Sequence, residues 1–250
     1  MNLSELNFCQ VALGDLHGGG PIQCAWRAGP VKTVLQEDAV HLWLANLVTE
    51  GWHPEASQQL LSEDERARAA RFRFERDRNR YVARRALLRQ VVGQYLQQAP
   101  GEIYFGENSC GKPELTSEAS RTLQFNLSTS GEWAMYGFVR RHRLGVDIEK
   151  IRRDFNWEEI VNRFFHPQEA SCIGESLASE RVGVFFTYWT LKEAFVKAHG
   201  VGLQRPLVEF DFTPLVRDGR KEFTDTDGSK WLCASLRPGV ELAAGLVVES

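Results

Sequence analysis

The chain has 250 residues, of which 43% are hydrophobic and 25% are charged, and its formal net charge is −3. Its length suits one large domain or two of about 125 residues, and its composition is ordinary for a soluble globular protein. No apolar run approaches the ~20 residues of a membrane span, and the first residues lack the pattern of a signal peptide. The five cysteines and six histidines show no metal-ligand or disulfide spacing. We therefore expect a reduced, cytoplasmic protein without a membrane partner.

Charge is distributed unevenly along the chain. Residues 66–89 contain ten arginines but only two acidic residues, Glu75 and Asp77. Since the net charge is negative, the rest of the chain is clearly acidic, and we expect a local basic face on the molecule. A face of this kind attracts phosphate groups or an acidic partner.

The first half of the chain predicts a strand, a long helical segment and three further strands. Residues 1–40 carry few structural signals and are expected to be loosely ordered, whereas residues 40–48 alternate like a strand. Ser62 and Glu65 form a capping box that begins a helical segment, which ends before Pro100. Short strands are then expected at 103–105, 122–127 and 133–139.

This order of elements recurs in the second half, beginning with a strand at 144–149. Helices are expected at 156–165, 167–177 and 184–199, and strands at 208–212, 230–236 and 241–248. Pro167 suits a first helical turn, and Gly200 suits a helix end. The recurrence predicts an α+β fold of two related halves, residues 1–141 and 142–250, with a site in the groove between them.

The stretch LGVDIEKI (144–151) contains two acidic residues on one face of the expected strand. Leu144, Val146 and Ile148 alternate with polar positions, so Asp147 and Glu149 lie side by side, roughly 6.5–7 Å apart along the strand. Like charges on one face repel each other, and a neighbouring glycine leaves room for another group to approach. The pattern suggests that the two carboxylates hold a ligand.

The stretch YWTLKEAFVKAHG (188–200) predicts a helix with Trp189, Glu193 and Lys197 on one face. An isolated Glu–Lys pair on a solvated surface would be worth only ~0.3–0.5 kcal/mol. The flanking aromatic residues argue instead for a partly buried helix, and Lys192 supplies a second expected cation beside Glu193. A carboxylate between two lysines stays ionised and ready to bind a cation.

Asp147, Glu149 and Glu193 together form a hard, all-oxygen ligand set. Magnesium takes one or two carboxylates and shares itself with water and substrate phosphates, whereas calcium takes more oxygens and transition metals favour His or Cys. A magnesium ion with lysines and arginines nearby points to phosphate or pyrophosphate chemistry. Neither a P-loop nor GxGxxG is present.

Two further stretches fit phosphate binding but are weak when taken alone. GKPEL (111–115) places Lys112 in an extended turn before a proline, where an ordinary loop lysine is the simpler interpretation. FNLSTSGEW (125–133) ends a strand with Ser128, Thr129 and Ser130. Small hydroxyls there can cradle a phosphate, although turn capping explains them equally well.

With GKPEL, FNLSTSGEW, LGVDIEKI and WTLKEAFVK in this order, the chain resembles the 4′-phosphopantetheinyl transferases, in their larger, two-repeat Sfp-like class. The resemblance runs from about Leu61 to Lys197 and is looser through the last strands. RFFHPQE also looks like a family stretch, although a helix-start acid is the simpler interpretation of Glu169. The resemblance implies a monomer whose two similar α+β halves form an internal pseudo-dimer, with coenzyme A bound between them. It also implies transfer of phosphopantetheine from coenzyme A to a serine of an apo acyl or peptidyl carrier protein, with release of 3′,5′-ADP.

Site roles follow from the resemblance, position by position. Asp147, Glu149 and Glu193 would hold Mg²⁺ on the coenzyme A pyrophosphate, and Lys197 would contact the same phosphates. Glu193, or a metal-bound water that it steers, would be the base for the carrier serine. The implied catalytic residues are thus Glu193, Lys197 and Asp147.

The nucleotide phosphates would be bound by Arg68, Lys112 and Ser128, with other arginines competing for the role of Arg68. The chain departs from many family members at Thr129, where they have a histidine after FNLS. Loss of a charge-assisted bond worth ~1.5–3 kcal/mol could weaken coenzyme A binding about tenfold or more. We predict reduced but real activity.

Three other functions compete with this interpretation. The first is a non-catalytic protein that binds acidic carrier domains through the arginine-rich helix and has a degenerate coenzyme A site. The second is another magnesium-dependent enzyme acting on a nucleotide diphosphate. The third is nucleic-acid binding, which we rank last and do not expect, because the chain is acidic and few aromatic residues interleave the arginines.

Overall fold

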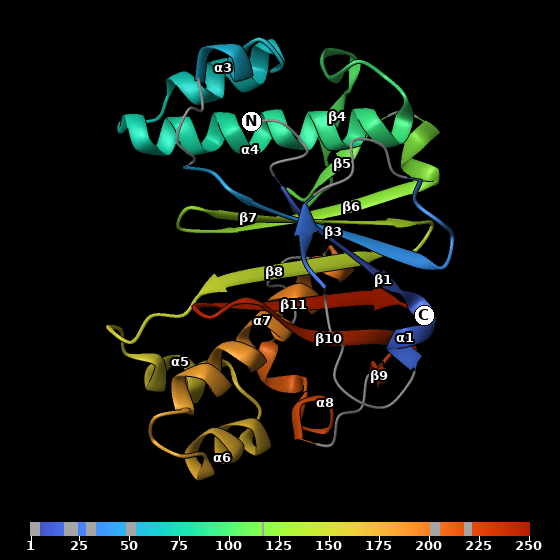
Figure 1. Ribbon diagram of the computed structural model, residues 1–250. Helices are drawn as coiled ribbons and strands as arrows, with labels where there is room; N and C mark the ends of the chain where they lie inside the picture. Colours follow the sequence, from blue (N-terminus) through green and yellow to red (C-terminus); the bar gives the residue numbers. More distant parts are fainter. Residues whose placement is uncertain are drawn as a thin grey trace.

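The computed structural model describes residues 6–17, 25–28, 34–48, 54–116, 118–200, 206–217 and 222–250. The fold is α+β, as the sequence predicts, and the strands within each sheet pair antiparallel. Figure 1 shows α4 above the five-stranded sheet, the four-stranded sheet below that, and α7 crossing the four-stranded sheet. Among the described residues, no helix is long and apolar enough to cross a lipid bilayer.

The five-stranded sheet has the strand order β2-β1-β3-β7-β6. Its strands are β1 (Asn7–Ala12), β2 (Arg27–Ala28), β3 (Ala39–Asn46), β6 (Leu123–Ser130) and β7 (Trp133–Arg140). One face packs against α4 (Glu75–Leu96), with Trp43, Leu87 and Phe138 in the shared core. The remaining elements of this region are α1 (Leu13–His17), α2 (Pro54–Gln58), α3 (Glu63–Ala70) and the hairpin of β4 (Phe105–Glu107) and β5 (Pro113–Leu115).

The four-stranded sheet has the strand order β8-β11-β10-β9. Its strands are β8 (Leu144–Lys150), β9 (Glu222–Thr224), β10 (Lys230–Gly239) and β11 (Leu242–Glu249). The helix α7 (Arg181–His199) packs on one face of this sheet, and Phe185, Phe195 and Trp231 belong to the core there. The other helices of this region are α5 (Trp157–Phe164), α6 (Pro167–Glu175) and α8 (Thr213–Arg217).

The two sheets meet through a third apolar core, which includes Leu42, Met135, Val146 and Leu246. Every strand of the first sheet ends by residue 140, and every strand of the second begins at residue 144 or later. The division into related halves at 141/142 stays an interpretation of this arrangement.

The expectation of a loosely ordered N-terminal segment is wrong for residues 6–17. Strand β1 pairs antiparallel with β3, from Asn7 opposite Leu44 to Ala12 opposite Ala39. Phe8 and Val11 are buried in two different cores. This strand is short and is held by pairing with β3, a contact that local sequence does not reveal.

The expected long helical segment is in fact two helices. The capping box at Ser62 and Glu65 is confirmed, but α3 ends at Ala70 and the chain turns back before α4. Glu65 of α3 reaches Arg85 and Arg89 of α4, and these ion pairs require the two helices to lie side by side. No glycine or proline marks the break, so sequence alone could not show it.

The expected strand at 208–212 is absent, and the strand expected at 103–105 is shifted to Phe105–Glu107. The first segment begins as a short 3₁₀ turn, Leu207–Glu209. Its backbone groups bond to side chains, because the carbonyls of Leu207 and Phe210 accept from Lys192. They are therefore not available to a strand ladder. By contrast, Gly200 ends α7 with a left-handed φ of 71°, as expected.

Candidate active site

The candidate site is built on the edge strands β6 and β8, which lie side by side between the two sheets. Side chains of β6 join these strands in place of a backbone ladder. Asn126 Oδ1 accepts from the Val146 N–H (2.8 Å), and Ser130 Oγ accepts from the Lys150 N–H (3.1 Å). Because both contacts advance in the same direction, β6 and β8 run parallel. Alternate side chains of β6 therefore point at the acidic stretch of β8.

Asp147 is buried in β8 and forms a compact cluster with Ser128 and Lys197. Its Oδ1 accepts from Ser128 Oγ (2.7 Å) and from Lys197 Nζ (2.6 Å). Lys197 Nζ also donates to Ser128 Oγ at 2.8 Å. The other oxygen, Oδ2, is buried without a hydrogen-bond partner. Burial raises the pKa of Asp147, and the charge of Lys197 opposes that rise.

Glu149 and Glu193 complete a group of three neighbouring carboxyls. Glu149 accepts from Ser130 Oγ at 2.6 Å. Burial raises the pKa of Glu149, and the charge of Asp147 adds to this rise. Burial likewise raises the pKa of Glu193, with further contributions from Asp147 and Glu149, while Lys197 opposes them. The structure thus brings together the three acids that the sequence predicted, in positions where they repel one another.

Two glycines allow α7 to approach this close. A Cβ added at Gly145 would lie 1.8 Å from the Ala194 carbonyl oxygen, and one at Gly245 would lie 2.3 Å from the Thr190 carbonyl oxygen. Side chains at these positions would therefore push the helix away from β8 and β11. The group that approaches the glycine of LGVDIE is helix α7, which places Lys197 in contact with Asp147 and Glu193 near it.

The carboxyl cluster fits a hard divalent cation. Asp147 Oδ2 is a buried acceptor without a donor, which is costly unless something else occupies that position. A divalent ion would also remove the repulsion among the three carboxylates. Oxygen-only ligands of this kind suit magnesium better than a transition metal.

Lys192 does not lie beside Glu193, and that expectation is wrong. It is fully buried on another face of α7, with its Nζ 2.8 Å from Glu169 Oε2. Glu169 also accepts from the backbone N–H of His166 and of Phe212 (both 2.9 Å). This buried pair is structural, so the simpler interpretation of Glu169 as a helix-start acid describes only part of its role.

Lys112 connects three segments through its buried ammonium group. Nζ donates to the carbonyl of Leu144 (3.0 Å) and to the carbonyl of Lys197 (2.7 Å). Burial lowers the pKa of Lys112 to about 8. Two of its three N–H donors thus bind backbone, which leaves one for a phosphate.

A groove of about 550 Å³ lies between α3, α4 and the β4–β5 hairpin. Its lining includes Arg68, Arg84, Tyr81, Gly111 and Leu127. The Arg84 guanidinium lies 5.2 Å from the centre of the Tyr81 ring, and its Nε is buried without a hydrogen-bond partner. Burial lowers the pKa of Arg84, so a bound anion would stabilise its charged form.

The arginine-rich segment divides into structural and available side chains. Arg85 and Arg89 are both paired with Glu65, and Arg89 also donates to the carbonyls of Pro100 and Ile103 (both 2.8 Å). Arg68 is exposed, makes a long contact of 3.5 Å with Glu107, and places its guanidinium 5.9 Å from the centre of the Tyr81 ring. Arg68 therefore remains suited to phosphate binding, whereas the two buried arginines are not part of an open basic face.

Thr129 is exposed on the groove side of β6. Side chains alternate along a strand, so Thr129 shares a face with Leu127, which lines the groove, while Ser128 and Ser130 point at β8. The sequence did not indicate the role of Ser130. The only sequence signal for this role was that Ser128 and Ser130 are two residues apart, as are Asp147 and Glu149.

Two family models match this chain. One, described as the 4′-phosphopantetheinyl transferase superfamily, matches residues 143–244, and one, described as 4′-phosphopantetheinyl transferase, N-terminal, matches residues 50–137. The chain is 37% identical over 199 residues to 4′-phosphopantetheinyl transferase HetI from Nostoc sp., covering 77% of this chain and 82% of the relative. For 4′-phosphopantetheinyl transferase Sfp from Bacillus subtilis, the identity is 31% over 166 residues, with coverages of 66% and 71%. The human L-aminoadipate-semialdehyde dehydrogenase-phosphopantetheinyl transferase is 28% identical over 193 residues, with coverages of 70% and 62%.

Proposed function

The chain belongs to the 4′-phosphopantetheinyl transferase family, and from this premise we propose its reaction. It transfers the 4′-phosphopantetheine group of coenzyme A to a serine hydroxyl of an apo acyl or peptidyl carrier protein. The second product is 3′,5′-ADP, and the reaction depends on Mg²⁺. The protein acts as a monomer, with coenzyme A bound in the cleft between its two halves.

The observation that carries this proposal is the Asp147 cluster. A buried carboxylate oxygen without a donor lies among two further carboxyls and one lysine, next to the strand that borders an arginine-lined groove. Carboxylates that hold a cation and arginines that hold phosphates are the two parts that pyrophosphate chemistry requires. Strand β6 connects them, because its alternate side chains face the two regions.

Asp147, Glu149 and Glu193 would hold the magnesium ion. When bound, magnesium neutralises charge on the pyrophosphate oxygens and so favours departure of the leaving group. Ser128 and Ser130 orient the carboxylates of Asp147 and Glu149 through their 2.7 and 2.6 Å hydrogen bonds. Lys197 places a positive charge beside the same cluster.

In the chemical step, the carrier serine oxygen attacks the phosphorus that bears the pantetheine arm. The bond from this phosphorus to the bridging oxygen breaks, and that oxygen leaves on 3′,5′-ADP. The serine proton passes to Glu193, whose carboxylate can accept it as a general base. Lys197 stabilises the negative charge that develops on the phosphate oxygens.

The nucleotide end of coenzyme A occupies the arginine-lined groove. Arg68 and Arg84 contact phosphate there, and Thr129 lies on the same side of β6. Lys112, whose ammonium group lies at the carbonyls of Leu144 and Lys197, donates its remaining N–H to a phosphate. Thr129 cannot supply the charged donor that a histidine would, so we expect the arginines to carry more of the phosphate binding.

The test is intact-mass measurement of apo carrier proteins after incubation with this protein, coenzyme A and magnesium. We expect a phosphopantetheine-sized gain that is lost with chelator and in Glu193→Gln. Glu158→Gln, an exposed glutamate of α5, is the matched control and should retain activity. Absence of transfer despite coenzyme A binding would favour a non-catalytic carrier-binding protein. The exposed Arg71, Arg73 and Arg76 are the observation that supports this alternative, because they can contact an acidic carrier domain. Absence of both would exclude the proposed reaction.

A further inference from the structure

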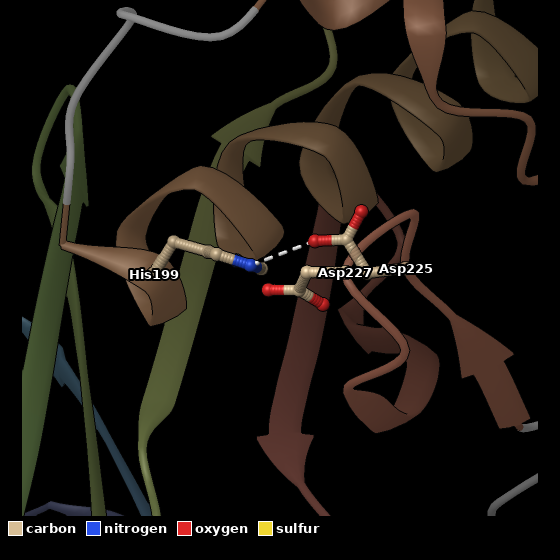
Figure 2. Close-up of side chains that lie close together, drawn as sticks. All are labelled: His199, Asp225 and Asp227. Atoms are coloured by element: carbon tan, nitrogen blue, oxygen red, sulfur yellow. Dashed lines mark hydrogen bonds and ion pairs between the residues drawn. The ribbon is translucent and has the colours of Figure 1, made fainter.

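His199, Asp225 and Asp227 meet at the end of α7, although 26 residues separate the histidine from the first aspartate. One ligand atom from each residue lies within 4.8 Å of the others. Figure 2 shows the imidazole directed at the two carboxyl groups, which belong to the turn between β9 and β10. Neither the proposed reaction nor the spacing of histidines in the sequence accounts for this cluster.

The imidazole is held in one orientation. Its ring lies 4.4 Å from that of Phe195 and 4.4 Å from that of Trp231, measured between centroids. Nδ1 is 3.2 Å from the Phe195 carbonyl oxygen, and Nε2 is 3.0 Å from Asp225 Oδ2. A carbonyl oxygen can only accept, so the contact with Phe195 is a hydrogen bond when Nδ1 carries a proton.

When Nδ1 alone carries the proton, Nε2 presents a lone pair to the carboxylate of Asp225. This contact is repulsive unless a proton or a metal ion lies between the two atoms. A histidine that donates through one nitrogen to a backbone carbonyl and presents the other to a metal is the usual arrangement of a metal ligand. The contact between Nδ1 and the Phe195 carbonyl is therefore an observation separate from the acidic residues.

The turn holds both carboxyl groups in place. Asp225 Oδ1 accepts from the Thr226 N–H (2.6 Å), and Asp227 Oδ1 accepts from the Ser229 N–H (2.8 Å). The side chain of Asp225 is fully buried, whereas Asp227 is exposed and gives access from solvent. The charges of Asp225 and Asp227 act on Arg143, but its guanidinium is paired with Glu249.

We propose that His199, Asp225 and Asp227 form a second metal site, for a divalent transition ion of the Zn²⁺ type. One nitrogen and two carboxylate oxygens are ligands that zinc accepts, with water in the remaining position. Magnesium and calcium prefer oxygen-only sites, so the two centres select different ions. The ion fastens the end of α7, which carries Glu193 and Lys197, to the β9–β10 turn.

The test is a Zn²⁺ titration of the full chain in a large excess of Mg²⁺, which occupies the Asp147 cluster. We expect one bound equivalent of zinc. Asp227→Asn should weaken zinc binding at least about tenfold. That variant is exposed and keeps an acceptor for Ser229, so it should fold normally, and His199→Gln should act in the same direction.

Two control variants identify other sources of zinc binding. Cys110→Ser removes an exposed free thiol, and Glu193→Gln removes a ligand of the magnesium site. Both should bind zinc as the unaltered chain does. The proposal is overturned if no zinc binds in excess magnesium, or if binding survives in both Asp227→Asn and His199→Gln. Because coenzyme A is absent from this titration, its outcome does not depend on the proposed transferase reaction.

Discussion

Two of the buried charge clusters on helix α7 differ in one respect. On one face, Lys192 and Glu169 are fully buried, and the lysine also donates to the carbonyls of Leu207 and Phe210. On another face, Lys197 meets Asp147, and one oxygen of this carboxylate has no donor. Both clusters place lysine and acid in contact, but only the second leaves a buried acceptor unsatisfied.

The difference shows how a structural ion pair can be told from a functional one. A buried charge is tolerated when its hydrogen-bonding capacity is filled by the protein. An acceptor left open in such a place indicates a ligand. The same distinction divides the arginines, since Arg85 and Arg89 are satisfied by Glu65 while Arg84 retains a buried Nε without a partner.

Breaking the satisfied pair should have the largest effect on stability. Lys192→Met leaves Glu169 buried without its cation and removes the donor to two carbonyls. We expect a loss of ~3–5 kcal/mol in the free energy of unfolding, measured by denaturant titration. Lys150→Met, which removes an exposed ion pair with Glu132, should change stability little.

A double variant sharpens this prediction. Glu169→Gln together with Lys192→Met removes both charges, so its loss of stability should be smaller than the sum of the two single losses. Additive losses would contradict the view that the two side chains act as one buried pair.

Displacing α7 should damage the unsatisfied cluster. Gly145→Ala puts a methyl group against the Ala194 carbonyl, and we expect ~2–3 kcal/mol of destabilisation. Transfer activity should fall further than the folded fraction, because Glu193 and Lys197 move away from Asp147. The matched control is Gly183→Ala in α7, where an added Cβ meets nothing within 4 Å. Normal activity in folded Gly145→Ala would contradict this account.

Sequence reasoning succeeded where periodicity and short motifs carried the information. The alternation in LGVDIE fixes a strand with Asp147 and Glu149 together, and Gly200 marks the end of α7. Spacing also placed Glu193 and Lys197 on one helical face, and both lie near Asp147.

It failed where the partner lies far along the chain. Lys192 and Lys197 lie on different faces of one helix, but the sequence does not say which acid each of them contacts. The turn between α3 and α4 depends on Glu65 reaching Arg89, 24 residues away. Likewise, the cluster of His199 with Asp225 exists only because the β9–β10 turn folds back onto α7.

A histidine at position 129 should add a phosphate donor to the groove that the unsatisfied Arg84 lines, and so increase the affinity for coenzyme A. Thr129 lies on the groove side of β6, where an imidazole could donate to a phosphate held by Arg68 and Arg84. We expect Thr129→His to lower the Kd for coenzyme A about tenfold, or ~1.4 kcal/mol, in a binding titration. Thr129→Val, which removes the hydroxyl at constant size, should not tighten binding. An unchanged or weaker affinity of Thr129→His would disprove this role for the position.

The smallest expected effect is a change in stability that tests the Asp147, Glu149 and Glu193 cluster without any substrate. Burial and two neighbouring acids raise the pKa of Glu193, so its contribution to stability is present at low pH and is lost as pH rises through the folded-state pKa. In magnesium-free buffer near neutral pH, Glu193→Gln should therefore stabilise the chain by about 1 kcal/mol, or about 2–4 °C in Tm. The gain should vanish near pH 4, where the glutamate is protonated.

Magnesium should raise the Tm of the unaltered chain and leave that of Glu193→Gln nearly unchanged, because only the intact set of carboxylates gains from the ion. A magnesium-free variant less stable than the unaltered chain would show that Glu193 is satisfied within the protein, as Lys192 is.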